Sequence, residues 1–141
     1  MKIGVPKEIK PQENRIGLTP DSVKTLTSNG HEVLIQNNGG FEAGFDNNQY
    51  KSAGAKIVDN PDDIFNDAEI IVKVKEPLSS EVNMIRENQI VFTYLHLAAA
   101  EKLTKGLIDS KAVCIAYETV TDNNGRLPLL APMSAVAGRM S

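Results

Sequence analysis

The chain has 141 residues, of which 41% are apolar and 23% are charged, a composition typical of one globular domain with a single core. The net charge of -3 argues against a partner that is a nucleic acid or an anionic membrane. No apolar run approaches the roughly 20 residues that span a bilayer, and the first ten residues lack the apolar core of a secretion signal. We therefore expect a soluble, cytoplasmic protein that has no nucleic-acid or membrane partner and no metal site.

Six short apolar runs read as strands, and the strongest of them, Ile90-Val91-Phe92, has the continuous apolar character of a buried parallel strand. Cys114 lies within another of these runs, so a buried and inert thiol is the better interpretation of this single cysteine. The expected strands are 2–5, 32–36, 55–58, 69–74, 90–92 and 112–117.

Helix signals separate these runs. Thr19-Pro20-Asp21 supplies a hydroxyl N-cap, a proline at the first position and an acid in the first turn, and Asn29-Gly30 ends that helix. The glycine-rich segment 37–45 matches neither GxGxxG nor the phosphate loop, so we interpret it as a flexible turn. Further helical segments are expected at 46–54, from Pro61, at 79–87, at 98–110 and from Pro132 onward.

The order of strand and helix repeats along the chain with few long connections. This alternation predicts βαβ units, which build a mostly parallel sheet with helices on both faces. The expected fold is therefore a three-layer α/β domain of the Rossmann-like or flavodoxin-like kind.

Polar side chains follow three of the predicted strands. Arg15 lies in the loop after the first strand, Lys75 follows the run 69–74, and Tyr94 and His96 follow Ile90-Val91-Phe92. Because parallel strands end at one edge of the sheet, these side chains should line one crevice. Arginine binds a carboxylate with two parallel hydrogen bonds, lysine acts as a point charge, and histidine exchanges protons near neutral pH. A small carboxylate or oxo acid suits such a crevice.

Each of these residues also has a plainer interpretation. Arg15 and Lys75 can be solvated surface charges, and His96 can cap the next helix or satisfy a buried carbonyl group. A lone histidine in such a position is more often structural than catalytic. The functional interpretation of His96 therefore rests on its occurrence together with Arg15 and Lys75.

Four stretches of sequence resemble alanine dehydrogenase, in the same order and at similar spacing: MKIGVPKEIKPQENRIGLTP at the start, VKVKEP at 72–77, TYLHLA at 93–98 and LLAPMSAVAGRM at 129–140. The resemblance covers the whole chain. The related pyridine nucleotide transhydrogenases share the fold and a similar opening, but their segment equivalent to TYLHLA lacks the histidine.

The resemblance implies an NAD-dependent oxidoreductase that interconverts L-alanine and pyruvate. By position, Arg15 would bind the substrate carboxylate, Lys75 would contact the carboxylate and carbonyl region, and His96 would be the acid/base, with Lys75 as its catalytic companion. Tyr94 would line the pocket. Met133 and Ser134 would lie at the nicotinamide side of the cleft. The family assembles as a homo-oligomer, usually a hexamer.

The sequence departs from the family in two ways. The family's dinucleotide-binding domain follows the last helix, and no GxGxxG occurs here, so we expect 1–131 to be the substrate domain and 132–141 to be the start of a linker helix. The chain alone should then bind NAD poorly and be inactive. Ala135 stands where the family usually has glutamate, so no polar contact is expected from that position.

Two other functions fit parts of the sequence. A module that binds a small carboxylate without chemistry would use Arg15 and Lys75 and leave His96 incidental. A transhydrogenase-like subunit would work with a partner chain that carries the nicotinamide site. Only the dehydrogenase needs an acid/base at His96.

Overall fold

The computed structural model describes residues 1–140 and contains one sheet of six parallel strands in the order β3-β2-β1-β4-β5-β6. Each strand pairs in parallel with its neighbours. The predicted parallel α/β fold is therefore confirmed. The strands are β1 (Lys2–Val5), β2 (Glu32–Gln36), β3 (Lys56–Val58), β4 (Ile70–Val72), β5 (Ile90–Thr93) and β6 (Val113–Ala116).

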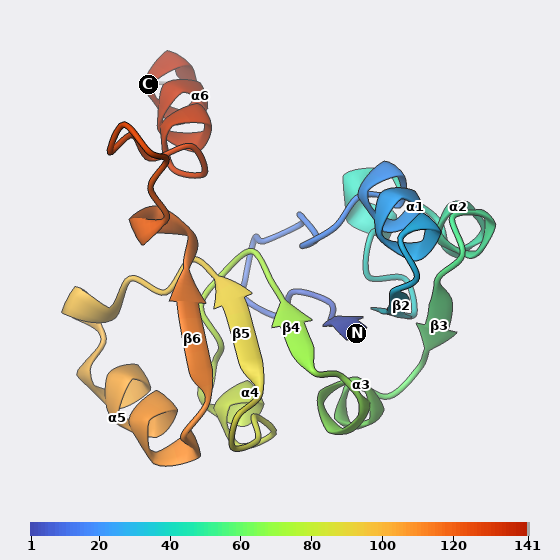
Figure 1. Cartoon of the computed structure of the whole chain (residues 1–141), viewed down its shortest axis with the longest axis horizontal. Coiled ribbons are helices and arrows are strands. Elements are labelled where there is room, and N and C mark those ends of the chain that lie inside the picture. The colour runs from blue at the N-terminus through green and yellow to red at the C-terminus, as the bar shows by residue number, and fades with distance from the viewer. Residues whose placement is uncertain (141) are drawn as a thin grey trace.

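Helices lie on both faces of the sheet (Figure 1). One core cluster packs α1 and α2 against β1, β2 and β3, and a second packs α3, α4 and α5 against the opposite face. These two apolar layers explain why the strands read as continuous apolar runs. The helices are α1 (Pro20–Ser28), α2 (Asn47–Ser52), α3 (Pro61–Asp67), α4 (Ser79–Val82), α5 (Glu101–Ser110) and α6 (Ala131–Met140).

The two halves of the sheet are covered differently. Side chains of β6 alternate, so that Cys114 and Ala116 pack against the core beneath α5 while Val113 and Ile115 are 49% and 40% exposed on the other face. No helix of the described residues covers that face of β5 and β6, and α6 stands apart beyond the end of β6 (Figure 1). The uncovered face borders the candidate site described below.

Three predicted boundaries were wrong. β4 ends at Val72 instead of Val74, because Lys73 turns into a buried ion network and the Val74 amide donates to a side chain. α4 ends at Val82, five residues early. α5 begins at Glu101, after a separate 3-10 turn at Leu97–Ala99.

The remaining elements lie close to their predicted positions. Thr19 caps α1, Asp46 forms a capping box with Gln49 at the start of α2, and the glycine-rich segment 37–45 is a turn that includes a short 3-10 helix. The last helix starts one residue before Pro132, and Ser141 lies outside the described residues. The boundary between 1–131 and 132–141 stays a prediction.

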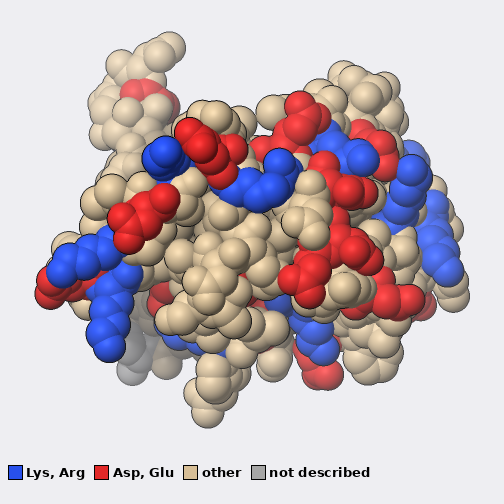
Figure 2. Space-filling model, turned by 90° about the horizontal axis from the view of Figure 1, so that it is seen from below, with Lys and Arg blue, Asp and Glu red and all other residues tan. Residues whose placement is uncertain are grey.

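The surface carries charges of both signs. On the face seen in Figure 2, acidic and basic side chains are interspersed and do not form an extended patch of one sign. Within residues 1–140, no helix is both long enough and apolar enough to cross a membrane.

Candidate functional site

The strand order changes direction between β1 and β4. β1 lies between β2 and β4, and the chain builds outward from β1 first to β3 and later to β6. In open α/β sheets, ligands bind beyond the carboxyl ends of the strands at such a switch point. The loops that follow β1 and β4 are therefore the first place to look for a site.

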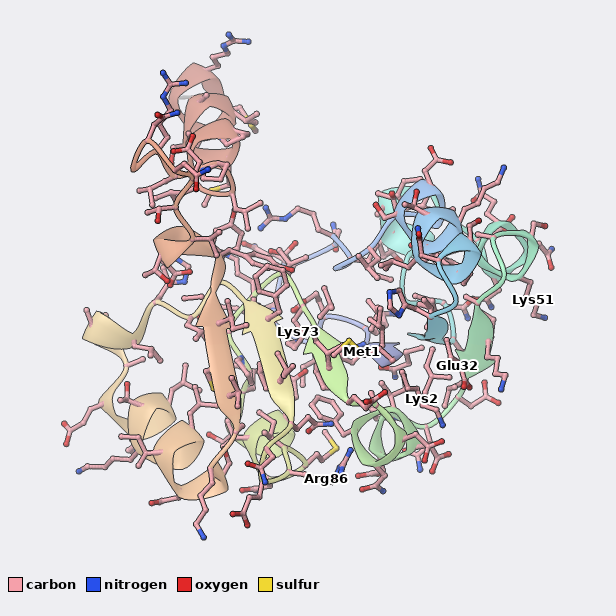
Figure 3. All side chains as sticks on the ribbon, viewed as in Figure 1. Met1, Lys2, Glu32, Lys51, Lys73 and Arg86 are labelled. Atoms are coloured by element: carbon pink, nitrogen blue, oxygen red, sulfur yellow. The ribbon has the colours of Figure 1, made fainter. Side chains whose placement is uncertain are left out.

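A buried ion network joins these two loops. Lys73 Nζ lies 3.0 Å from Glu8 Oε2 and 2.8 Å from Glu81 Oε1, and the three side chains are only 1%, 2% and 3% exposed. We call Glu8, Lys73 and Glu81 the buried triad. Figure 3 shows Lys73 near the carboxyl end of β4, among the strands, whereas Lys51 points outward from α2. Full burial of an ammonium group requires this kind of pairing.

The buried triad also fixes the backbone. Glu8 Oε1 accepts hydrogen bonds from the Val74 amide at 2.6 Å and from the Lys75 amide at 3.3 Å, and Glu81 Oε2 accepts one from the Leu78 amide at 2.9 Å. The main chain at Lys75 is therefore held by a side chain of the loop that carries Arg15. Thr93 Oγ1 adds a hydrogen bond to the Lys75 carbonyl oxygen at 2.9 Å.

Arg15 forms a bidentate pair with Glu13. Its Nε and Nη2 atoms donate to the two carboxylate oxygens at 2.8 and 2.7 Å. The Arg15 hydrogen bond lowers the pKa of Glu13 to about 2, against the opposing effect of burial, and the charge of Lys75 adds to this shift. Glu13 in turn raises the pKa of Arg15. The arginine side chain stays 53% exposed, so its remaining donors are available to a ligand.

A cavity of about 440 Å³ opens between these loops and the uncovered face of β5. Its walls are mostly apolar and aromatic, and Arg15 supplies the charge. Tyr94 is part of the wall, packs edge-to-face on Tyr117 with ring centroids 4.9 Å apart, and donates its hydroxyl to the Leu129 carbonyl oxygen at 2.6 Å. The lining residues are Arg15, Ile16, Thr19, Ala43, Phe45, Val74, Phe92, Tyr94, Tyr117 and Leu129.

His96 does not line this cavity but lines a separate hollow. Its ring stacks at 6.1 Å from the Tyr94 ring, its side chain is 51% exposed, and its backbone is left-handed with φ at 50°. Nδ1 is 3.5 Å from Glu76 Oε2, and Lys10 binds the other oxygen of Glu76. His96 can therefore reach a ligand while a carboxylate faces one of its ring nitrogens.

Glu118 fixes the main chain beneath His96. Its Oε1 accepts hydrogen bonds from the Leu95 amide at 3.0 Å and the His96 amide at 2.8 Å. Burial alone raises the pKa of Glu118, but these amide hydrogen bonds outweigh that effect, and the net shift is downward. The left-handed turn at His96 is thus stabilised by an anion from the end of the next strand.

The predicted site residues fall into two groups. Arg15 and Tyr94 line one cavity, whereas Lys75 and His96 do not: the Lys75 carbonyl oxygen accepts a hydrogen bond from Thr93 Oγ1, and the His96 ring stacks on Tyr94. The other group lies on α6. Met133 shares a separate hollow with Arg15, while Ser134 is exposed and donates its amide to the Leu130 carbonyl oxygen. Ala135 is exposed too.

Sequence reasoning expected cations at this edge and missed the carboxylates that accompany them. Glu13 faces Arg15, Glu76 faces His96, and Glu8 and Glu81 flank Lys73. One signal was available. A lysine between Val72 and Val74 in an apolar run either points outward or needs a buried partner.

The sheet order and the cavity at its switch point define a Rossmann-like α/β domain. The chain belongs to the family described as "Alanine dehydrogenase/PNT, N-terminal domain", whose model matches residues 4–137.

Individual relatives agree with this assignment. The chain is 55% identical over 141 residues to an alanine dehydrogenase of Staphylococcus epidermidis and 54% identical to one of Halomonas elongata. Each alignment includes 100% of this chain and 38% of the relative. A solved L-alanine dehydrogenase superposes with a TM-score of 0.95 at 51% identity, covering 99% of this chain and 38% of that one.

A solved transhydrogenase from Sinorhizobium meliloti matches with a TM-score of 0.81 at 23% identity, over 88% of this chain and 35% of that one. At this identity the likeness concerns the fold alone. The chain thus spans well under half the length of the alanine dehydrogenases it resembles.

Proposed function

We propose that this chain is the substrate-binding portion of an NAD-dependent alanine dehydrogenase. The reaction is L-alanine, NAD⁺ and water to pyruvate, ammonium, NADH and a proton. The observation that carries the proposal is a cavity at the switch point of the sheet that Arg15 and Tyr94 line, with the His96 ring stacked on Tyr94 and the Lys75 main chain bound by Thr93. Membership in the alanine dehydrogenase family supports the same reaction.

Arg15 binds the substrate carboxylate in this proposal. Glu13 already occupies Nε and one donor of Nη2, which leaves the Nη1 and Nη2 edge of the guanidinium group for a second bidentate pair. Glu13 also neutralises Arg15, so the positive charge that balances a monoanionic acid comes from Lys75. Lys75 contacts the carboxylate and the carbonyl oxygen of pyruvate as a point charge.

His96 moves the protons. It takes a proton from the water molecule that adds to the imine carbon and returns that proton to the amine of the carbinolamine. It then accepts the hydroxyl proton as the C–N bond breaks to give pyruvate and ammonia, and passing this proton on yields ammonium. Tyr94 forms a wall of the pocket through its ring, because its hydroxyl is engaged with the Leu129 carbonyl oxygen. The apolar ring cluster excludes bulk water from the reacting carbon.

The glycine-rich segment 37–45 does not have the open backbone of a dinucleotide cradle. The glycine-rich segment 37–45 packs closely on the protein, since a Cβ atom at Gly40 would lie 2.7 Å from the Tyr50 hydroxyl and one at Gly39 would lie 2.9 Å from the Gln36 carbonyl oxygen. Met133 and Ser134 offer one thioether and one hydroxyl, too little to hold a dinucleotide alone. NAD, when bound to the complete enzyme, supplies the hydride acceptor, and we propose that Met133 and Ser134 border that site.

The experiment that tests the proposal is calorimetric titration of this chain with pyruvate, repeated with Arg15→Ala. We expect saturable binding that the substitution weakens by roughly 10- to 100-fold, since each hydrogen bond to a charged group is worth about 1.5–3 kcal/mol and 1.4 kcal/mol is tenfold. Arg126→Ala, in an exposed turn, is the matched control and should leave the affinity unchanged.

Two results would count against the proposal. If the unchanged chain did not bind pyruvate, no substrate site would be preformed here. If Arg15→Ala and Arg126→Ala weakened binding equally, Arg15 would not be the carboxylate ligand.

A further inference from the structure

Glu76 has an oxygen atom with unused hydrogen-bonding capacity beside His96. Its Oε1 is bound by Lys10 Nζ, whereas its Oε2 is buried and accepts no hydrogen bond from residues 1–140. A buried carboxylate oxygen without a donor has lost its hydrogen bonds to water and gained none in return, which is unfavourable. The acceptor therefore needs a donor close at hand.

His96 Nδ1 is the ring nitrogen that faces this acceptor. It lies 3.5 Å from Glu76 Oε2, slightly beyond the range of a good N–H···O hydrogen bond. A small rotation of the half-exposed ring closes the difference, and hydrogen bonds of acid/base groups commonly shorten once a ligand is bound. Among the described residues, no other carboxylate comes within 4.0 Å of a His96 ring nitrogen. The carboxylate of Glu118 accepts its hydrogen bonds from the main-chain amides of Leu95 and His96.

Glu76 is charged at neutral pH. Burial by itself raises the pKa of its carboxyl group, but the hydrogen bond from Lys10 and the charges of Lys10 and His96 outweigh burial and hold the pKa below its ordinary value. A carboxylate can only accept hydrogen bonds, so it favours the imidazole form that carries its proton on Nδ1.

We propose that Glu76, held by Lys10, is a positioning residue that fixes His96 in the Nδ1–H tautomer and so makes Nε2 the atom that exchanges protons with the substrate. The role of Nε2 rests on the proposed function, whereas the tautomer is a property of this chain without any ligand. A carboxylate that orients a histidine through one ring nitrogen leaves the other free for acid/base work.

The substitution Glu76→Gln should change the tautomer of His96 in a defined direction. The ammonium group of Lys10 must still meet an oxygen, so the new side chain turns its amide NH₂ toward His96. That NH₂ group donates to Nδ1, which then has to be unprotonated. The substitution should therefore move the proton from Nδ1 to Nε2.

The test is long-range ¹H–¹⁵N NMR of the chain labelled at histidine, at about pH 9, where an imidazole with an ordinary pKa of about 6.5 is neutral. The chain has two histidines, so His31 serves as an internal reference for folding. We expect mainly Nδ1–H at His96 in the unchanged chain and mainly Nε2–H in Glu76→Gln, with His31 unaffected.

Two further variants sharpen the test. Glu101→Gln makes the same substitution in an exposed pair with Lys105 and should leave His96 unchanged. In a Lys10→Met background the amide that Glu76→Gln introduces has no fixed direction, so the shift between tautomers should become smaller.

Equal tautomer populations in the unchanged chain and in Glu76→Gln would overturn the proposal, as would a majority of Nε2–H in the unchanged chain. These results are independent of pyruvate binding. A shift in tautomer without pyruvate binding would support the positioning role and contradict the proposed function. Pyruvate binding without a shift in tautomer would support the proposed function and contradict the positioning role.

Discussion

Two groups of charged side chains meet at the carboxyl edge of the sheet, and they differ in burial. Lys73 of the buried triad is 1% exposed, whereas Arg15 and His96 are 53% and 51% exposed although each faces a carboxylate. The exposed groups, which we call the exposed pairs, are Arg15 with Glu13 and His96 with Glu76. The first group is buried away from any ligand, whereas Arg15 and His96 of the second group are accessible.

The difference separates two tasks within one site. The carboxylates of the buried triad accept hydrogen bonds from the amides of Val74, Lys75 and Leu78, so the triad fixes the backbone. The exposed pairs fix side-chain direction and leave Arg15 and His96 about half-exposed. We therefore expect changes in the triad to act mainly on stability, and changes in the exposed pairs to act mainly on binding.

Lys73→Met should produce the largest effect. It leaves Glu8 and Glu81 buried with no cation between them, and breaking a buried pair in this way destabilises a protein by about 3–5 kcal/mol. The measurement is the free energy of unfolding in urea. Lys105→Met, which breaks an exposed helical pair, should change it by about 0.5 kcal/mol or less.

A combined variant checks the cause. Lys73→Met together with Glu8→Gln and Glu81→Gln removes every charge of the buried triad, so it should be more stable than Lys73→Met alone. If the triple variant were the less stable of the two, uncompensated charge would not explain the loss.

Gly17→Ala acts where the Arg15 loop rests on β4. The added Cβ atom would lie 2.7 Å from the Val72 carbonyl oxygen, which is backbone and cannot turn away. Overpacking of this kind destabilises by about 1–3 kcal/mol, and here it should also displace Arg15 and weaken pyruvate binding. Urea unfolding and calorimetry of the same variant measure the two effects.

Gly138→Ala is the matched control, because its added methyl group meets open space on α6. An equal loss of pyruvate affinity in both variants would contradict the idea that the Arg15 loop depends on close contact with β4.

Much of this fold could be predicted because each strand is apolar and each helix has local start signals. The capping residues Thr19 and Asp46 act within three residues of sequence, and Thr19 caps α1 as predicted, while the predicted helical segment at 46–54 begins with an Asp46 cap. The end of β4 could not be predicted in this way. It is set by Glu8, which lies 65 positions from Lys73 and reaches it only once the sheet has formed.

The candidate site, like the fold, contains contacts that sequence patterns indicate and contacts that they do not. Arg15, Lys75, Tyr94 and His96 could be proposed as site residues because strand ends share an edge, and their roles stay predictions. Their acidic neighbours could not, since Glu76 faces His96 from a loop 20 positions away and nothing local marks that contact. The short turn before α5 was missed for a related reason, because Glu118 stabilises it from the end of β6.

The smallest effect is expected at Glu13. Its pKa is about 2 in the folded chain, below the ordinary value of 4.5, so its contribution to stability is present above about pH 4.5 and is lost as the pH falls toward 2. Arg15 is half-exposed and screened by water, so this contribution should be about 1 kcal/mol or less.

Glu13→Gln should remove that part of the acid dependence, which is measured by urea unfolding at about pH 6 and about pH 3. The unchanged chain should lose more stability between the two pH values than Glu13→Gln does, and Glu101→Gln should behave like the unchanged chain. If Glu13→Gln removed as much of the acid-dependent loss of stability as Lys73→Met removes of the free energy of unfolding, Arg15 and Glu13 would support the fold in the way the buried triad does. The donors of Arg15 would then not be free for a substrate, and the division between buried triad and exposed pairs would fail at the residue where it matters most.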